Sequence, residues 1–465
     1  MHTYDLSGGK LCDTLPAALR ADILSGALAP GEKLPSKRRL AEHHGISVNT
    51  VQNAYEQLIA EGYIEARERS GYYVSELPTL QPTHSPVTGH IPTNDAKKAA
   101  SATCLLDLVT NAPEAACFPF SLWSRLTRRV LSEEDSRLLA PLPAAGAPTL
   151  QKAISRYLRE GRGIAVAPEQ IVIGAGTEYL YQLLIQLLGR ARRYGLEDPG
   201  HSKIARIYAL NGVDFCPVPL DEGGVIATAP EALGVEVLHI SPNHHFPTGT
   251  VTPVTRRRAL LAWMQEGDRY IIEDDYDSEF RFTGRPIPPL FGMDTADRVI
   301  YMNTFSKTIA PSMRISYMVL PHPLLERYRA QLGFYACPVP AFEQYILARF
   351  MDEGHFDRHL HRMRTFYRAR RDKILSLLAH SPYAARITVK EADAGLHFLL
   401  EFHTSKRDAE LRQIFENNGI RVAFLGDYRI SDGGAEADTH TVVLNYSGVD
   451  PTALAAGLGR VMEQI

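Results

Sequence analysis

Cysteine is scarce in this sequence, and long apolar runs are missing from it. The 465 residues include five scattered cysteines, with no CxxC pair among them: Cys12, Cys104, Cys117, Cys216 and Cys337. This usage predicts neither a disulfide framework nor a zinc module, and it suits a reducing compartment. No apolar stretch reaches the ~18 residues that a membrane helix needs, and the first ten residues have no signal-peptide core. We therefore expect a soluble, cytoplasmic protein with no membrane partner.

An excess of positive charge is also lacking. Lys and Arg number 50 against 53 Asp and Glu, so the formal net charge is −3 at pH 7. Any contact with nucleic acid has to come from a local patch, because the chain as a whole is not basic. Hydrophobic residues make up 45% and charged residues 22%, an ordinary globular composition that excludes a wholly disordered chain.

Prolines divide the chain into two parts. Between residues 77 and 103, four prolines (Pro78, Pro82, Pro86 and Pro92) stand among Ser and Thr, and no helical or strand period survives. This composition predicts a linker. The predicted organisation is a small domain over residues 1–76, the linker, and a large domain over residues 104–465, whose part from 335 to 465 is expected to form a separate C-terminal subdomain.

The small domain has the pattern of a winged helix-turn-helix. An apolar residue recurs every four positions from Leu11 to Ile23, which predicts a first helix. Ser36 is placed to cap a second helix that Gly45 ends, and Ser47 is placed to cap a third. Two short alternating segments around residues 63–76 then predict a hairpin. Two helices joined by a tight turn and followed by a hairpin are typical of this DNA-binding motif.

Short polar and basic side chains mark the expected DNA contacts of this domain. Residues 1–76 hold eight Lys and Arg against ten Asp and Glu, so position matters more than the sum. A helical protein-interaction module is the alternative interpretation. The residues expected to meet phosphates and base edges are Ser36, Arg38, Ser47, Asn49, Thr50, Asn53, Arg67, Arg69 and Gly71.

The large domain alternates apolar strands with helical patterns, which predicts an α/β fold with a largely parallel sheet and ligand sites at the strand ends. Lys307 follows one such strand, among hydroxyls and with Arg314 nearby. Such a cluster suits a phosphate group and an amine that captures an aldehyde. Asp274 ends another buried strand and could pair with a pyridinium nitrogen. Gly174–Thr177 lies between a strand and a helix, where backbone N–H groups favour an anion.

Each of these features has an ordinary alternative. Lys307 could be a solvated loop lysine, and Glu273, Asp274 and Asp275 could hold magnesium. A magnesium nucleotide site would predict a GK[ST] loop, and the sequence has none. His355 and His359 have the spacing of a metal-binding helix face, but no metal site is expected there.

Residues 34–74 resemble the GntR family of winged-helix regulators, with turn, caps and wing in register. From about residue 104 onward the chain resembles fold-type I pyridoxal-phosphate enzymes, with EDPG at 197–200 and AGLH at 394–397. The two parts together resemble the MocR subfamily of transcriptional regulators. The resemblance implies that Lys307 forms a Schiff base with pyridoxal 5'-phosphate, that Asp274 pairs with the ring nitrogen and that Tyr276 pairs with the ring hydroxyl. It assigns His201 to the ring face and the phosphate to Ala175, Gly176, Thr177, Thr304, Ser306 and Arg314.

The chain departs from the aminotransferase pattern where a substrate would bind. Val443 stands where an Arg usually holds the α-carboxylate, and Phe246 stands where an Asn precedes Pro-Thr-Gly. PLPAAG replaces a segment with a Tyr expected to reach the partner subunit's cofactor. Val48 and Gln52 replace arginines common in the recognition helix. Turnover of ordinary α-amino acids is therefore not expected, although the question of residual enzymatic activity stays open.

The function predicted from the sequence is transcriptional regulation by a homodimer, arranged head to tail, that binds an operator with two half-sites. Pyridoxal phosphate bound at Lys307 is the predicted signal, as in the vitamin B6-responsive branch of the subfamily. Three alternatives remain: a regulator that senses an amino compound reacting with the cofactor, an active aminotransferase with an accessory head, and a DNA-binding protein whose large domain serves only for dimerisation.

Overall fold

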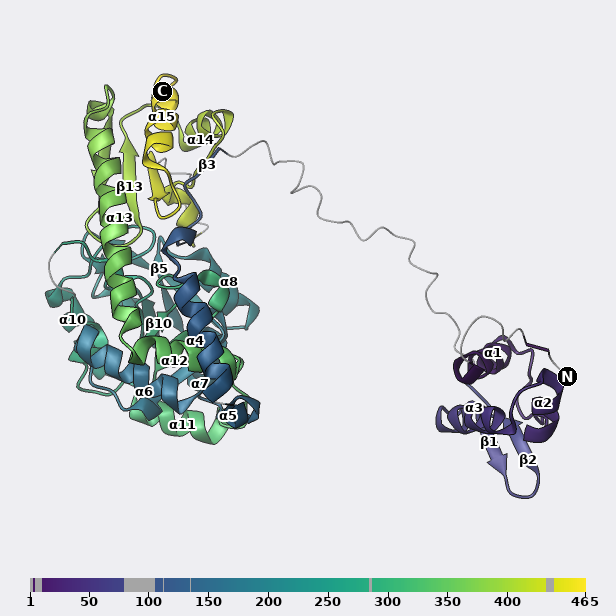
Figure 1. Ribbon diagram of the computed structural model, residues 1–465. Coiled ribbons are helices and arrows are strands. Elements are labelled where there is room, and N and C mark those ends of the chain that lie inside the picture. Colours follow the sequence, from purple (N-terminus) through teal and green to yellow (C-terminus); the bar gives the residue numbers. More distant parts are fainter. Residues whose placement is uncertain are drawn as a thin grey trace. The chain divides into compact units, whose positions relative to one another are not determined.

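The computed structural model describes residues 3–4, 11–78, 105–111, 113–133, 135–283, 287–431 and 439–465. The chain divides into two compact units, residues 1–98 and 99–465 (Figure 1). Most of the predicted linker, residues 79–103, lies outside the described ranges. No helix in these ranges is long and apolar enough to cross a membrane.

The N-terminal unit is a winged helix-turn-helix, as predicted. Its elements are α1 (Leu11–Ser25), α2 (Lys37–His44), α3 (Val48–Ala60) and the antiparallel hairpin of β1 (Ile64–Arg67) and β2 (Gly71–Val74). The apolar stripe that begins the chain is buried, with Leu15 and Leu19 at most 2% exposed. They pack with Val51, Tyr55 and Leu58 of α3. Burial of this stripe therefore orients α3 against α1.

The turn between α2 and α3 is set by local hydrogen bonds. The Ser36 and Ser47 hydroxyls accept bonds from the backbone N–H groups of Arg39 and Thr50, at 3.4 and 3.0 Å. Gly45 ends α2 at φ 66°, in the left-handed region that glycine enters without a steric penalty. These contacts confirm both predicted N-caps and the predicted end of α2.

The second unit is built on an eight-stranded sheet. In sheet order the strands are β4 (Ile171–Gly174), β11 (Ser316–Val319), β10 (Val299–Thr304), β9 (Tyr270–Asp274), β8 (Val237–Ile240), β5 (Tyr194–Asp198), β6 (Phe215–Asp221) and β7 (Gly224–Val225). The pairs from β10 through β6 are parallel, and those involving β11 and β7 are antiparallel. The mixed, mostly parallel α/β sheet confirms the predicted fold class.

Helices cover both faces of this sheet, which explains why its strands are apolar almost throughout. Val172 packs into the core beneath α7 (Thr177–Leu188), α8 (Ser202–Leu210) and α11 (His322–Leu332). Its neighbours Ile171 and Ile173 face the opposite core, as the period of two in a strand requires. The helices on that side are α4 (Phe120–Glu133), α6 (Pro148–Tyr157), α10 (Val254–Gln265) and α12 (Ala341–Asp352), and the short helices are α5 (Asp135–Leu139) and α9 (Ala229–Ala232).

A smaller α+β layer completes the unit (Figure 1). The antiparallel strands β12 (Ile387–Lys390), β13 (His397–Phe402) and β15 (Thr441–Asn445) pack with the long helix α13 (His355–Ala379), α14 (Asp408–Asn417) and α15 (Pro451–Met462). The pair β3 (Leu106–Asp107) and β14 (Ile420–Arg421) lies beside them, so Leu106 and Leu108 join this core although they lie far away in the sequence.

The sheet topology gathers the predicted site residues at one edge. The strands β5, β8, β9 and β10 run parallel, so their C-terminal ends meet on the same side. The end of β4 joins them, because β4 and β10 are both antiparallel to β11. Lys307, Tyr276 and His201 follow β10, β9 and β5, and α7 begins just after β4. Ligand sites in such folds lie at this edge.

Candidate cofactor cavity and DNA-binding face

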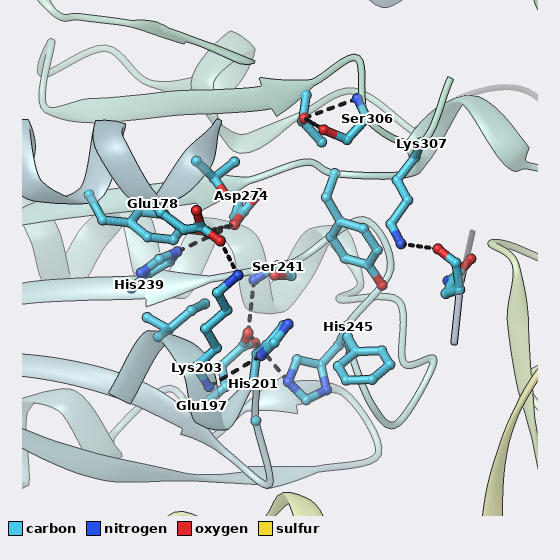
Figure 2. A pocket seen from close by; sticks show the side chains of 18 of the residues that line it. Glu178, Glu197, His201, Lys203, His239, Ser241, His245, Asp274, Ser306 and Lys307 are labelled. Atoms are coloured by element: carbon cyan, nitrogen blue, oxygen red, sulfur yellow. Dashed lines mark hydrogen bonds and ion pairs between the residues drawn. The ribbon is translucent and has the colours of Figure 1, made fainter. Parts of the chain in front are cut away.

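A cavity of about 500 Å³ opens at this edge of the sheet. Eight predicted residues line it: Thr177, His201, Asp274, Tyr276, Thr304, Ser306, Lys307 and Arg314. Gly176 is the N-cap of α7 beside Thr177, and Ala175 packs partly against the adjacent core. Figure 2 shows Asp274 and Lys307 on different walls of the cavity, which separates the predicted acid from the predicted amine.

Lys307 presents a half-buried amine. Its Nζ donates to the backbone carbonyl of Asn111 at 2.7 Å, a contact drawn in Figure 2. Burial lowers the pKa of Lys307 from its usual value, although the negative charge of Asp277 opposes the change. A larger share of the amine is therefore neutral near pH 7 than in an exposed lysine, and the neutral amine is the form that attacks an aldehyde.

Asp274 is held by residues that the sequence analysis did not identify. Its Oδ2 accepts a hydrogen bond from the Tyr181 hydroxyl and lies 3.7 Å from His239 Nε2. His239 Nδ1 in turn lies 2.9 Å from the Tyr208 hydroxyl. The other carboxylate oxygen, Oδ1, is buried without a hydrogen-bond partner. A buried acceptor of this kind calls for a donor, and a protonated ring nitrogen would supply one.

The acids next to Asp274 are engaged elsewhere, which argues against magnesium. Glu273 accepts the backbone N–H groups of Leu290 and Phe291, each at 2.8 Å. Asp275 forms a buried ion pair with Arg162 at 2.6 Å. Of the three consecutive acids, only Asp274 lines the cavity.

One part of the cavity lining, formed by Thr177, Thr304, Ser306 and Arg314, is here called the anion-binding cup after its predicted role. Thr177 begins α7, whose first N–H groups have no partners within the helix. Arg314 reaches the same place, because a Cβ on Gly176 would lie 2.2 Å from Arg314 Nη2. The Thr304 hydroxyl donates to Ser306 Oγ at 3.0 Å and holds that hydroxyl in place. A phosphate group suits this combination of helix N-terminus, guanidinium and hydroxyls.

Two further side chains enter the cup and were not predicted. Glu178, the second residue of α7, forms an ion pair with Lys203 of α8 (Figure 2). It forms a second ion pair with Arg314 at 2.7 Å. Glu178, Lys203 and Arg314 all line the cavity. Their signal in the sequence was weak, since an acid at a helix start and a lysine in an exposed helix are common features.

His201 and Tyr276 lie in the cavity, but their predicted roles remain predictions. His201 caps α8, with Nδ1 3.3 Å from the Lys203 backbone nitrogen and its ring 5.6 Å from that of Phe246. Removal of the ring from water lowers the pKa of His201, which favours the neutral form. The Tyr276 hydroxyl lies 3.3 Å from His244 Nδ1.

Three residues behind Tyr276 form a group that was not anticipated. Ligand-type atoms of His244, Asp277 and His397 lie within 4.8 Å of one another, all buried. His244 Nδ1 is 2.9 Å from Asp277 Oδ2. His355 and His359, which have the spacing of a metal-binding helix face, contact different partners. His359 Nε2 lies 2.8 Å from the Thr308 carbonyl oxygen, whereas His355 Nε2 contacts Glu353.

The carboxylate clamp of aminotransferases has no counterpart in the described cavity lining. Val443 is fully buried. Arg421 pairs with Asp107 at 3.1 Å, and Arg429 is exposed. The cationic residues among those that line the cavity are Lys203, Lys307 and Arg314. The side chain of Asn445, two positions after Val443, is held by the backbone carbonyls of Leu108 and Val109.

The buried pair of Glu197 and His245 leads to a pH prediction. Glu197 Oε2 accepts from the Ser241 N–H at 2.8 Å and lies 3.4 Å from His245 Nε2. Burial, opposed by that N–H and reinforced by Asp274, raises the pKa of Glu197 to about 8. Burial lowers the pKa of His245 to about 3, so both groups are neutral at pH 7.

Glu197→Gln is expected to stabilise the second unit increasingly as the pH rises from 5 to 8. A carboxyl whose folded pKa is raised stabilises the fold below its unfolded pKa, and this contribution is lost as the pH rises through the folded pKa. One pKa unit corresponds to about 1.4 kcal/mol. The difference in unfolding free energy between the variant and the wild type should therefore change by about 1 kcal/mol or more between pH 5 and 8. Urea unfolding at several pH values measures this difference. Glu222→Gln, which removes the same charge at an exposed position, is the control. A pH-independent difference would contradict the assignment.

The predicted DNA-contacting residues lie mostly on the surface of the N-terminal unit. Thr50 and Gly71 are half-buried, and the exposed members are Ser36, Arg38, Ser47, Asn49, Asn53, Arg67, Arg69. Arg67 is engaged with Glu65 and lies 4.3 Å from the centre of the Tyr73 ring. Arg69 stands at the hairpin tip, with φ 59°. Their roles in DNA binding remain predictions.

Comparison with known proteins connects both units to families. Residues 11–74 match the bacterial regulatory proteins of the gntR family, and residues 106–434 match aminotransferase class I and II. The chain is 32% identical to the probable rhizopine catabolism regulatory protein MocR of Rhizobium meliloti, over 95% of this chain and 90% of that protein. It is 31% identical to the HTH-type pyridoxine biosynthesis transcriptional regulator PdxR of Corynebacterium glutamicum, over 97% and 95%.

Solved structures agree on the fold of the second unit. The kynurenine aminotransferase of Pyrococcus horikoshii superposes with a TM-score of 0.69 at 22% identity, covering 80% of this chain and 94% of that one. At this identity the likeness shows the fold alone. The superposition, which covers 94% of the aminotransferase chain, therefore identifies the fold of the second unit as that of an aminotransferase.

Proposed function

Because the chain belongs to the MocR group of GntR-type transcriptional regulators, in which a helix-turn-helix head is fused to an aminotransferase-like domain, we propose that pyridoxal phosphate is the signal that controls its DNA binding. Lys307 would hold the aldehyde carbon, Asp274 the ring nitrogen and the α7 N-terminus with Arg314 the phosphate. Bound in this way, the group supplies an electron-withdrawing ring, chemistry that aminotransferases use in catalysis.

One observation carries this proposal: the cavity has a complete set of groups for the cofactor, whereas the substrate clamp is absent from its described lining. Asp274, Lys307 and the residues of the anion-binding cup line a common cavity. One buried Asp274 oxygen has no hydrogen-bond partner, and Val443 is apolar. Losing a charge-assisted bidentate contact weakens binding of an α-carboxylate by roughly 1.5–3 kcal/mol. We therefore expect no turnover of ordinary α-amino acids.

The relatives support a link to vitamin B6. The name of the Corynebacterium protein describes it as a regulator of pyridoxine biosynthesis. A signal derived from the vitamin would suit a regulator of that kind. Pyridoxal phosphate would act here by binding one conformation better than another, and its differential affinity would set the size of the shift.

Homodimerisation would give the regulator two DNA-binding heads. Cyclic dimers are the commonest symmetric assemblies, and two heads match two half-sites of an operator. Asn49 and Asn53, exposed on α3, would read bases, and Arg38, Arg67 and Arg69 would contact phosphates. The Pro-rich composition of residues 77–103 predicts a linker, which would allow the heads to reach separated half-sites.

Operator binding with and without the cofactor tests the proposal. DNA duplexes selected from a random pool on the full-length protein provide the probe, and cofactor-free protein is titrated with pyridoxal phosphate while its affinity for the selected DNA is measured at fixed salt. A change in affinity or in footprint on cofactor binding is expected. Absorbance of the protein and borohydride fixation at Lys307 report cofactor binding in the same samples. An unchanged affinity and footprint with the cofactor bound would reject the proposal.

An amine as effector is the second candidate, and the apolar side of the cavity favours it. Val109, Phe246, Tyr428 and Ile430 line the space together with Lys307. An amine without an α-carboxylate could lie against them and react with the bound cofactor. A screen of such amines against the cofactor-loaded protein, followed by absorbance and by DNA affinity, separates the two candidates.

Gly176→Ala is expected to weaken binding of pyridoxal phosphate about tenfold or more. Gly176 has φ 91°, and a Cβ there would lie 2.2 Å from Arg314 Nη2, so the substitution adds backbone strain of about 1–3 kcal/mol and displaces the guanidinium. Gly189→Ala is a matched control, because Gly189 has φ 99° at the other end of α7 with nothing within 4 Å of a Cβ. Equal effects of the two substitutions on cofactor affinity would contradict the assignment of the cup.

A further inference from the structure

The anion-binding cup already contains an anion that belongs to the protein itself. The Glu178 carboxylate contacts Lys203 through Oε1 (Figure 2) and Arg314 through Oε2, so each oxygen faces one of the two cations of the cup. Its side chain is 35% exposed and lines the cavity. A carboxylate accepting from two cations at the start of a helix is stabilised by both cations and by the helix dipole.

Glu178 is negatively charged at neutral pH. A hydrogen bond from Lys203 and the charges of Lys203 and Arg314 lower its pKa, against a smaller opposing effect of burial. The charges of Lys203, Arg314 and Glu178 therefore sum to about +1, whereas the two cations alone would present +2. A phosphate group, with a charge of about −1.5 to −2 at pH 7, would meet this carboxylate on entering the cup.

We propose that Glu178 is an internal competitor for the phosphate group, and that it sets the concentration of pyridoxal phosphate to which the regulator responds. The inference rests on the proposed cofactor site. To bind Arg314, the phosphate has to displace the Glu178 carboxylate. Glu178 then either keeps only its ion pair with Lys203 or stays close to the phosphate, where the two negative charges repel each other. Both outcomes weaken binding of a phosphate-bearing ligand selectively, because an uncharged substituent would not compete for the guanidinium.

A competing interpretation makes the opposite prediction. If Glu178 only holds Arg314 and Lys203 in position, its removal loosens the cup and weakens phosphate binding. If it competes, its removal frees two cations and strengthens phosphate binding. The two interpretations therefore predict opposite signs for the change in phosphate affinity.

Glu178→Gln tests the inference in the full-length protein. The amide is nearly the same size and can accept a hydrogen bond from one of the two cations through its single oxygen, but it carries no charge. The variant is titrated with pyridoxal phosphate and with pyridoxal, its analogue without the phosphate, and the adduct is followed by absorbance and borohydride fixation. We expect about tenfold tighter binding of pyridoxal phosphate and unchanged binding of pyridoxal. Glu169→Gln, an exposed substitution with the same change in net charge, is the control.

Inorganic phosphate provides a third probe, which is independent of the aldehyde. Its affinity for the cofactor-free proteins, measured by calorimetry, should also rise about tenfold in Glu178→Gln. Weaker or unchanged binding of both phosphate and pyridoxal phosphate would overturn the inference, as would an equal gain for pyridoxal. If neither aldehyde forms an adduct with Lys307 in either protein, the proposed function fails, and the phosphate titration still decides the role of Glu178.

Discussion

Lys307→Ala is expected to abolish fixation of pyridoxal phosphate by borohydride and to leave DNA binding insensitive to the cofactor. Among the described residues that line the cavity, Lys203 is the only other lysine, and its amine is paired with Glu178. No second amine is therefore placed to capture the aldehyde. Loss of a covalent bond should reduce apparent affinity by more than a hundredfold, beyond the effect of losing one hydrogen bond. Absorbance, fixation and DNA affinity are measured on the same protein preparations.

Two companion variants separate capture of the aldehyde from charge. Lys307→Arg keeps a positive charge but cannot form a Schiff base, so it should behave like Lys307→Ala. Lys373→Ala, an exposed substitution on α13, should bind the cofactor normally. A cofactor-dependent change in DNA affinity that persists in Lys307→Ala would contradict the proposed mechanism of sensing, even if the cavity still bound pyridoxal phosphate.

The lowered pKa of Lys307 adds a pH signature to this result. Capture of the aldehyde requires the neutral amine, and burial makes that form available at lower pH than in an exposed lysine. The rate of adduct formation should therefore reach half of its maximum below pH 10.4, the usual pKa of lysine. A half-maximum near 10.4 would mean that the amine is solvated.

Arg162→Met is expected to destabilise the second unit by about 3–5 kcal/mol. Arg162 and Asp275 form a buried ion pair at 2.6 Å, with side chains 4% and 1% exposed. Burial alone would lower the pKa of Arg162, but the charge of Asp275 outweighs it and raises the pKa. Removing the guanidinium leaves Asp275 with hydrogen bonds from Asn243 and Tyr301 but with an uncompensated buried charge.

Urea unfolding of the wild-type protein and its variants measures this effect. Arg159→Met, on the exposed side of the same helical turn, is the matched control and should change stability little. Adding Asp275→Asn to Arg162→Met should recover part of the loss, because the orphaned charge is removed. A midpoint of Arg162→Met equal to that of Arg159→Met would show that the pair contributes nothing to the fold. Since Asp275 adjoins Asp274, weaker cofactor binding is also expected in the destabilised variant.

The elements that sequence reasoning predicted are those with local causes. Ser36 and Ser47 form N-caps through contacts three residues away, and Gly45 ends α2 through its own backbone conformation. Lys307 and Asp274 were identified because each follows an apolar strand, and strand ends of a parallel sheet meet at one edge. These signals are contained in short segments, so they can be read without knowing the fold.

The residues that sequence reasoning missed depend on packing between distant segments. Tyr181 and His239 reach Asp274 from α7 and β8, and neither has a local pattern that distinguishes it from a core residue. Glu178 meets Lys203 and Arg314 only because α7, α8 and the segment after β10 converge at one edge of the sheet. Their distances are set by sheet register and helix packing.

The amino-acid sequence by itself determined the two units, the helix caps of the head, the order of strands and helices and the presence of an amine, an acid and an anion-binding turn, because each depends on neighbours along the chain. Only the tertiary structure decided that these groups share one cavity, that Asp275 is neutralised by Arg162 while Asp274 keeps a free acceptor, and that a carboxylate occupies the cup. Burial and charge pairing depend on which segments are brought together, and that choice is made by the sheet as a whole.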